Sequence, residues 1–238
     1  MNRENKQIKS IDTFYVLDFD RCLGNVDASF GLLVDIIKGL SAIDAVKIQL
    51  AYKDAENAMV SFSVLDFIKK NCPDINLDFI KKVYSERAKS IQSSLLEPGS
   101  IKFIDFLNLT NRDFCIMSYG EKNWQNLKIL STGIGNLPRL IVSSHKKDSI
   151  IASWFDTSNH KFIVPKVCFL DNQPRLVREI ILIDDKLSVF DNLPDGARGY
   201  LVIGSANRAQ SIKKVPLRVE CVNHVDEIID LEIRHSKK

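Results

Sequence analysis

The stretch TFYVLDFDRCLGN, residues 13–25, decides how this sequence is interpreted. An apolar run at residues 14–17 ends in two aspartates, Asp18 and Asp20, which are separated by one aromatic residue. Two carboxylates this close repel each other, and each loses hydration at the mouth of a buried strand. A turn or a helix cap would explain them, because aspartate is common in both. The alternative is a site that needs two acids at the end of a strand.

The bulk composition is that of an ordinary globular protein. Its 238 residues suit one large domain, or a core with a smaller attached domain. The net charge of +3 is small and no basic patch carries interleaved aromatic residues, so we expect no nucleic-acid partner. Five scattered cysteines without a CxxC pair indicate reduced thiols. The polar start shows no signal-peptide pattern and no apolar run reaches 18 residues, so we expect a cytoplasmic protein that does not enter the membrane.

Short apolar runs alternate with helical patterns along most of the chain. The runs are residues 14–17, 114–117, 140–142, 180–183 and 200–203. Near-continuous apolar runs of this length are typical of strands buried on both faces, as in a parallel sheet. The alternation therefore predicts an α/β fold with a Rossmann-like parallel sheet.

One long segment breaks the alternation and shows only helical patterns. After a first helix, it predicts further helices at residues 41–59, 63–70 and 77–95. The chain returns to the sheet through Glu97-Pro98-Gly99, a turn signal, and a helix at 100–108. We therefore predict an inserted all-helical cap at residues 25–96 and a core formed by residues 11–24 and 97–238.

The stretch at residues 156–179 has the least regular pattern. Two short apolar runs, 161–164 and 167–170, flank Pro165 and predict a small hairpin.

Polar residues collect where the predicted strands end. They are Asp18 and Asp20 after the first run, Ser118 after the second, Lys146 and Lys147 after the third, and Asp184 and Asp185 after the fourth. Ligands of open parallel sheets bind beyond these carboxyl ends. Converging carboxylates destabilise one another unless a cation lies between them, and Mg²⁺ binds a few carboxylates together with phosphate oxygens. Ser118 and Lys147 would then complete a cradle for a dianionic group.

The order and strand context of these motifs resemble the haloacid dehalogenase-like (HAD) superfamily, from Phe14 to about Ile203. The resemblance implies a Rossmann-like core, and the helical insertion is similar to the C1-type caps of that superfamily. Two departures are Cys22, where the family usually has threonine or valine, and the pair Asp184-Asp185, where it often has Gly-Asp.

The resemblance also implies roles for individual residues. Asp18 would be the nucleophile that forms an aspartyl-phosphate, and Asp20 the general acid and base. Asp18, the Asp20 backbone carbonyl, and Asp184 or Asp185 would bind Mg²⁺. Ser118 and Lys147 would bind the transferring phosphoryl group. Lys147 is preferred over Lys146, because Ile150 and Ile151 then follow at core-facing spacing.

The sequence thus predicts a Mg²⁺-dependent phosphatase that hydrolyses a small phosphorylated metabolite. A phosphomutase and a non-catalytic HAD-like binding protein are the alternatives. The sequence names neither the substrate nor the oligomeric state.

Overall fold

The strand that opens the chain lies in the middle of a mixed sheet. The computed structural model describes residues 8–40, 44–58, 60–204 and 214–235. Within them, eight strands form one sheet. Six follow the order β3-β2-β1-β6-β5-β4, and β6 also pairs with β7, which pairs with β8. The strands are β1 (Lys9–Leu17), β2 (Asp113–Tyr119), β3 (Arg139–Val142), β4 (Phe155–Asp156), β5 (Lys161–Val164), β6 (Arg175–Asp184), β7 (Ala197–Val202) and β8 (Val219–Val222).

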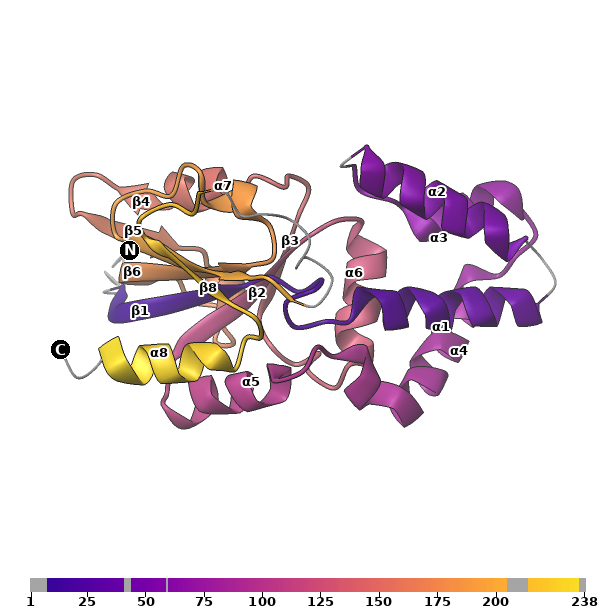
Figure 1. Ribbon diagram of the computed structural model, residues 1–238, viewed down its shortest axis with the longest axis horizontal. Helices are drawn as coiled ribbons and strands as arrows, with labels where there is room; N and C mark the ends of the chain where they lie inside the picture. The colour runs from indigo at the N-terminus through magenta and orange to yellow at the C-terminus, as the bar shows by residue number, and fades with distance from the viewer. Residues whose placement is uncertain (1–7, 41–43, 59, 205–213, 236–238) are drawn as a thin grey trace, which may run out of the picture.

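Helices flank this sheet and also form a separate group beside it (Figure 1). The α-helices are α1 (Val26–Gly39), α2 (Ala45–Asn57), α3 (Val64–Asn71), α4 (Leu77–Ala88), α5 (Ser100–Leu109), α6 (Lys122–Ser131), α7 (Lys147–Ser153) and α8 (Glu227–His235). Short 3₁₀-helices are η1 (Lys89–Leu95), η2 (Lys166–Cys168) and η3 (Leu187–Phe190). None of the helices in the described ranges is long and apolar enough to cross a membrane.

Strand alternation divides the apolar run of β1 between the two faces of the sheet. Tyr15 and Leu17 join one apolar cluster with side chains of α5 and α8, and Phe14 and Val16 join another with side chains of α7 and η3. Figure 1 shows α5 and α8 on one side of the sheet and α7 on the other. Because both faces are covered there, the strand is apolar at every position from Phe14 to Leu17. The predicted α/β fold with a Rossmann-like sheet is confirmed.

The predicted helical segment builds an apolar cluster of its own. Leu33, Ile48, Ile68 and Tyr84 belong to it, and so does Trp124 of α6. In Figure 1, α6 lies between the sheet and α1–α4. The division into a core and a cap at residues 25–96 stays a prediction, since α6 contributes to both sides of that boundary.

The two chain crossings between the sheet and these helices run side by side. Gly24 forms an isolated antiparallel bridge with Leu96. The Asn25 N–H donates to the Leu95 carbonyl at 2.9 Å, and the Glu97 N–H donates to the Leu23 carbonyl at 2.9 Å. A Cβ at position 24 would lie 2.5 Å from the Phe19 ring, so this close approach requires glycine.

The predicted hairpin of residues 161–164 and 167–170 is wrong. β5 pairs antiparallel with β4 and β6, whereas residues 166–168 form η2. Pro165 ends the strand, and its carbonyl accepts a hydrogen bond from the Cys168 N–H at 3.0 Å, which closes a 3₁₀ turn.

Two predicted helices differ from the structure at their ends. The helix predicted at 41–59 is α2, while Ser41–Ile43 and Met59 lie outside the described residues. The helix predicted at 77–95 stops at Ala88 and continues as η1, where Ile91 has a non-helical backbone.

The buried carboxylate of Glu232 joins α8 to the sheet through hydrogen bonds. Glu232 accepts hydrogen bonds from the Tyr15 hydroxyl at 2.6 Å, the Tyr200 hydroxyl at 2.5 Å and Arg198 Nη2 at 2.8 Å. Burial opposes its ionisation, but these donors and the Arg198 charge hold the pKa of Glu232 below its ordinary value. The ionised form of Glu232 therefore stabilises the fold.

We predict that Glu232→Ala lowers the free energy of unfolding by roughly 3 kcal/mol or more, because it leaves two buried hydroxyls without their acceptor and removes one of the two carboxylates that pair with Arg198. Asp230→Ala, at an exposed position of the same helix, should cost less than about 1 kcal/mol. Urea unfolding above pH 6 measures both. Equal losses would show that the network contributes no more than an exposed charge.

Candidate active site

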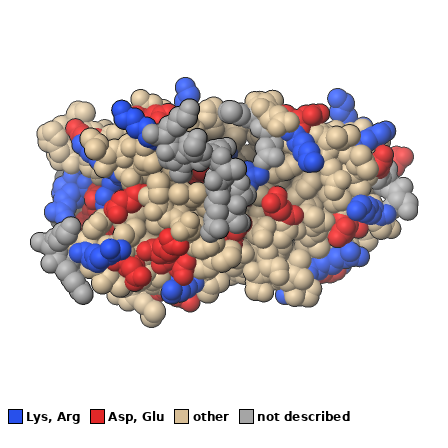
Figure 2. Space-filling model, in the orientation of Figure 1, with Lys and Arg blue, Asp and Glu red and all other residues tan. Residues whose placement is uncertain are grey.

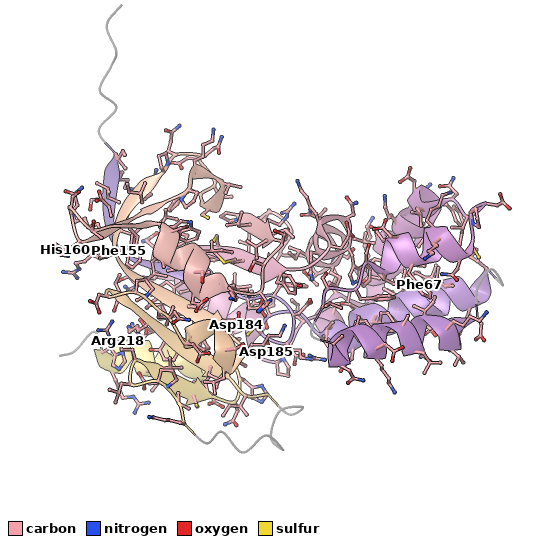
Figure 3. All side chains as sticks on the ribbon, turned by 90° about the horizontal axis from the view of Figure 1, so that it is seen from above. Phe67, Phe155, His160, Asp184, Asp185 and Arg218 are labelled. Atoms are coloured by element: carbon pink, nitrogen blue, oxygen red, sulfur yellow. The ribbon has the colours of Figure 1, made fainter. Side chains whose placement is uncertain are left out.

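Parallel pairing of β1 with β6 sets two aspartates side by side. Leu17 is in register with Ile183, and the Asp18 N–H donates to the Ile183 carbonyl at 2.8 Å. Asp18 therefore continues the ladder by one residue and lies next to Asp184. Figure 3 shows Asp184 and Asp185 where the sheet comes nearest to the helical group.

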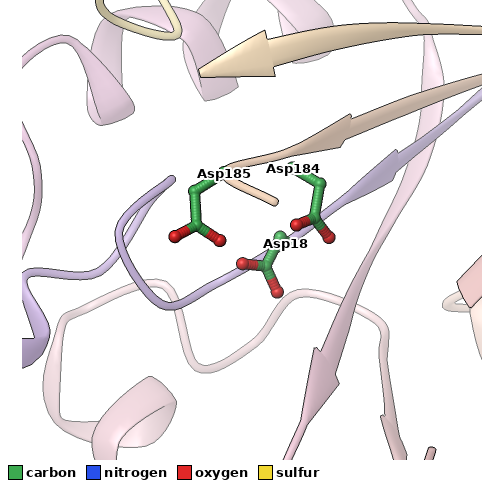
Figure 4. Close-up of side chains that lie close together, drawn as sticks. All are labelled: Asp18, Asp184 and Asp185. Carbon is green, nitrogen blue, oxygen red and sulfur yellow. The ribbon is translucent and has the colours of Figure 1, made fainter. Parts of the chain in front are cut away.

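Three carboxylates converge at this edge (Figure 4). Oxygen atoms of Asp18, Asp184 and Asp185 lie within 4.8 Å of one another. Asp18 and Asp184 are buried, and Asp185 is half-buried. Burial raises the pKa of Asp18 to about 7, with Lys147 opposing the shift and Asp184 adding to it. Burial and then the charges of Asp18 and Asp184 also raise the pKa of Asp185.

Lys147 opens α7 and reaches two of these acids. Its ammonium donates to Asp18 Oδ1, and to Asp184 Oδ2 at 2.6 Å. Burial opposes the charged form of Lys147, but the two carboxylates raise its pKa well above the ordinary value. Lys146 is exposed and precedes the helix. The structure therefore brings Lys147, and not Lys146, to the carboxylates.

Asp20 lies beside this cluster without joining it. Its carboxylate contacts the ammonium of Lys128, and it accepts a hydrogen bond from Gln125 Nε2 at 2.9 Å. Burial would raise its pKa, but Lys128 and Gln125 hold the pKa of Asp20 below the ordinary value. The Phe19 carbonyl accepts hydrogen bonds from the Leu23 and Gly24 N–H groups, so its oxygen is already paired within the loop. The Asp20 carbonyl as a metal ligand stays a prediction.

Ser118 is the penultimate residue of β2 and is fully buried. Its hydroxyl has no hydrogen-bond partner within the part of the chain that the structure describes. Most buried hydroxyls are paired, so a ligand oxygen would satisfy this one. Its role in binding phosphate stays a prediction.

Lys128 is the residue that the sequence interpretation missed. It is 1% exposed on α6, and its ammonium lies 5.7 Å from the Phe19 ring centre and 5.6 Å from that of Trp124. A lysine between Leu127 and Ile129, four residues after Trp124, interrupts the buried side of that helix. This interruption was the available signal, because a buried lysine requires an acidic partner.

The carboxylate cluster fits a divalent cation. Its three carboxylates and the Lys147 ammonium leave a formal charge of −2 when all are ionised (−3 + 1). The adjacent Asp20–Lys128 pair is neutral as a unit. Carboxylate oxygens are the ligands that Mg²⁺ prefers, and a buried charge of −2 is costly without a counter-ion.

Comparisons with known proteins support the fold. No protein-family model matches this sequence, and no curated protein matches it closely enough to count as a relative. Among solved structures, one described as a haloacid dehalogenase-like hydrolase from Burkholderia xenovorans is 14% identical, with a TM-score of 0.64, and the match covers 94% of this chain and 97% of that one.

Two further solved structures match at similar coverage. A HAD phosphatase from Thermococcus onnurineus is 13% identical, with a TM-score of 0.56, over 94% of this chain and 98% of that one. An L-2-haloacid dehalogenase is 11% identical, with a TM-score of 0.52, over 94% of this chain and 99% of that one. The chain thus has the haloacid dehalogenase-like fold, as its motifs predicted. Identities this low leave the reaction open.

We predict that Asp18→Asn stabilises the metal-free protein in a pH-dependent way. The raised pKa of Asp18 means that folding disfavours its ionised form, so wild-type stability falls as the pH rises from about 4 to about 7. Asparagine does not titrate. The stability gain from the substitution should therefore be about 2–3 kcal/mol larger at pH 8 than at pH 5.

Urea unfolding in EDTA at both pH values measures this difference. Asp35→Asn, on the exposed face of α1, is the matched control and should show no such difference. A gain from Asp18→Asn that is the same at pH 5 and pH 8 would contradict the raised pKa.

Proposed function

We propose that this protein is a Mg²⁺-dependent phosphatase, which hydrolyses a small phosphomonoester through an aspartyl-phosphate on Asp18. The observation that carries the proposal is the meeting of Asp18, Asp184, Asp185 and Lys147 at the ends of two adjacent parallel strands. A divalent cation and a phosphate dianion together would balance this buried charge.

The first step transfers the phosphoryl group to Asp18. A carboxylate oxygen of Asp18 attacks phosphorus, the new O–P bond forms, and the bond to the alcohol oxygen breaks. Asp20 gives the leaving oxygen its proton. Lys147 and the Ser118 hydroxyl stabilise the transferring oxygens. When Mg²⁺ is bound by Asp18, the Asp20 carbonyl and Asp184 or Asp185, it supplies positive charge that screens the carboxylate from the phosphate.

The second step releases inorganic phosphate. Asp20, now a carboxylate, takes a proton from water, and the hydroxide attacks phosphorus while the bond to Asp18 breaks. The contact with Lys128 favours the carboxylate form of Asp20 and therefore suits this step. Proton donation in the first step requires that Lys128 and Asp20 separate, or that an incoming phosphate draws Lys128 away.

We predict that Asp18→Asn and Asp20→Asn fail at different steps. Asp18→Asn removes the nucleophile and should abolish turnover. Asp20→Asn keeps the nucleophile and should lower kcat by about 10²–10⁴-fold, with the phosphorylated enzyme persisting longer. Phosphate release from a panel of phosphomonoesters with Mg²⁺ or EDTA measures turnover, and intact-protein mass spectrometry after rapid acid quench measures the phosphorylated enzyme.

Asp35→Asn is the matched control for both variants and should keep wild-type activity. Phosphate transfer between sugars without net release would instead indicate the phosphomutase. No release and no transfer across the panel would leave the non-catalytic binding protein. Wild-type turnover by Asp20→Asn would contradict the roles assigned here.

A further inference from the structure

A pocket of about 380 Å³ lies between the sheet edge and the helical group. Asp20, Gly120 and Asp185 line it on the sheet side, and Tyr52 and Phe62 line it from the helical side. This volume lies in the range of small-molecule sites.

The pocket adjoins the candidate active site. A cavity of about 30 Å³ lies against Asp18, Lys147 and Asp184, and it shares Asp20 and Tyr119 with the larger pocket. A phosphate held against Asp18 would therefore direct its alcohol part past Asp20 into the larger space.

The far wall of the larger pocket is aromatic. Tyr52 of α2 stacks on Phe30 of α1, with ring centres 4.4 Å apart, and its ring meets Phe62 edge-on at 6.0 Å. Phe62 in turn packs against Phe67 at 5.5 Å. Rings fixed by one another offer a preformed surface, which favours a planar ring with little loss of side-chain entropy.

The charged side chains that line the pocket come from the ends of the strands and from α6. They are Asp20, Arg21, Lys128, Asp185 and Lys186, and none of the lining residues of α2 or of 60–62 is charged. Lys186 has its ammonium 6.0 Å from the centre of the Tyr119 ring. The pocket is therefore charged where it shares residues with the phosphate cavity, whereas the side formed by α2 and residues 60–62 is uncharged and carries the rings of Tyr52 and Phe62. A sugar would meet few polar partners on this aromatic wall.

We infer that the substrate is a phosphomonoester whose alcohol part carries a planar aromatic ring, as in a nucleoside monophosphate or an arylmethyl phosphate, and that Tyr52 and Phe62 bind this ring. The inference rests on the proposed function only for where the phosphate group binds. The position of the aromatic ring follows from the Tyr52 and Phe62 rings that line the pocket.

Two matched phosphonates test the ring end without turnover. Benzylphosphonate and cyclohexylmethylphosphonate have similar size and charge, and differ in whether the ring is aromatic. Calorimetric titration in Mg²⁺ should show tighter binding of benzylphosphonate. Phe62→Leu should lower the affinity for benzylphosphonate by about 5- to 30-fold, the equivalent of roughly 1–2 kcal/mol for one ring contact. It should change the cyclohexyl analogue little, and Tyr52→Leu should act in the same way.

Phe79→Leu is the matched control. Phe79 is 49% exposed on α4 and does not line the pocket. Phe79→Leu makes the same substitution in the same helical group but away from the pocket, so it should leave the affinities for both phosphonates unchanged. An equal loss in Phe79→Leu and Phe62→Leu would assign the effect to general packing and overturn the inference.

A turnover panel separates this inference from the proposed function. Benzyl phosphate and a nucleoside 5′-monophosphate should show higher kcat/KM than cyclohexylmethyl phosphate and ribose 5-phosphate. Hydrolysis without an aromatic preference overturns the inference and leaves the phosphatase standing. An aromatic preference in binding without any hydrolysis overturns the phosphatase and leaves the binding of an aromatic ring by Tyr52 and Phe62 standing. Neither binding nor hydrolysis overturns both.

Discussion

The buried ion cluster at the ends of β1 and β6 constrains the rest of the structure. Asp18 and Asp184 are neighbours because their strands are paired in parallel, and Lys147 lies between them at the start of α7. Burying these charges is costly, and the cost falls only if the partners are held in good geometry. The fully buried apolar runs of β1 and β6 hold them, since a slip of one residue would turn each aspartate to the opposite face.

Lys128 links this charged centre to the helical group. Its ammonium contacts Asp20, while its neighbours Trp124 and Leu127 on α6 belong to the apolar cluster of α1–α4. The ring of Trp124 lies edge-on to Tyr84 at 5.4 Å. One short helix thus carries both a residue that contacts Asp20 and the surface on which the helical group packs. Figure 2 shows both signs of charge interspersed on the face that it presents.

The parts of the fold and of the candidate site that could be predicted from the sequence are those that a local sequence pattern marks. Asp18, Lys147 and Asp184 each follow an apolar run, and parallel strands bring such positions to one edge, so their order along the chain was enough. The Lys128–Asp20 contact joins residues 108 positions apart, and helical periodicity gives only the face that a lysine occupies. The pairing of β5 was missed for a similar reason. Its partner β6 comes after an irregular turn, and the apolar runs on either side of that turn did not indicate how its backbone folds.

The paired crossings limit how the helical group can move. The Gly24–Leu96 bridge ties the outgoing and returning segments together, so the two can bend only as one unit. Gly24 packs closely against the Phe19 ring, and Gly99, with φ of 84°, packs closely against the Asp226 side chain, so both crossings are held against the sheet domain. Tyr84 of α4 lies edge-on to Trp124 of α6, and Gln125 of the same helix donates to Asp20, so the helical group packs on the helix that contacts Asp20.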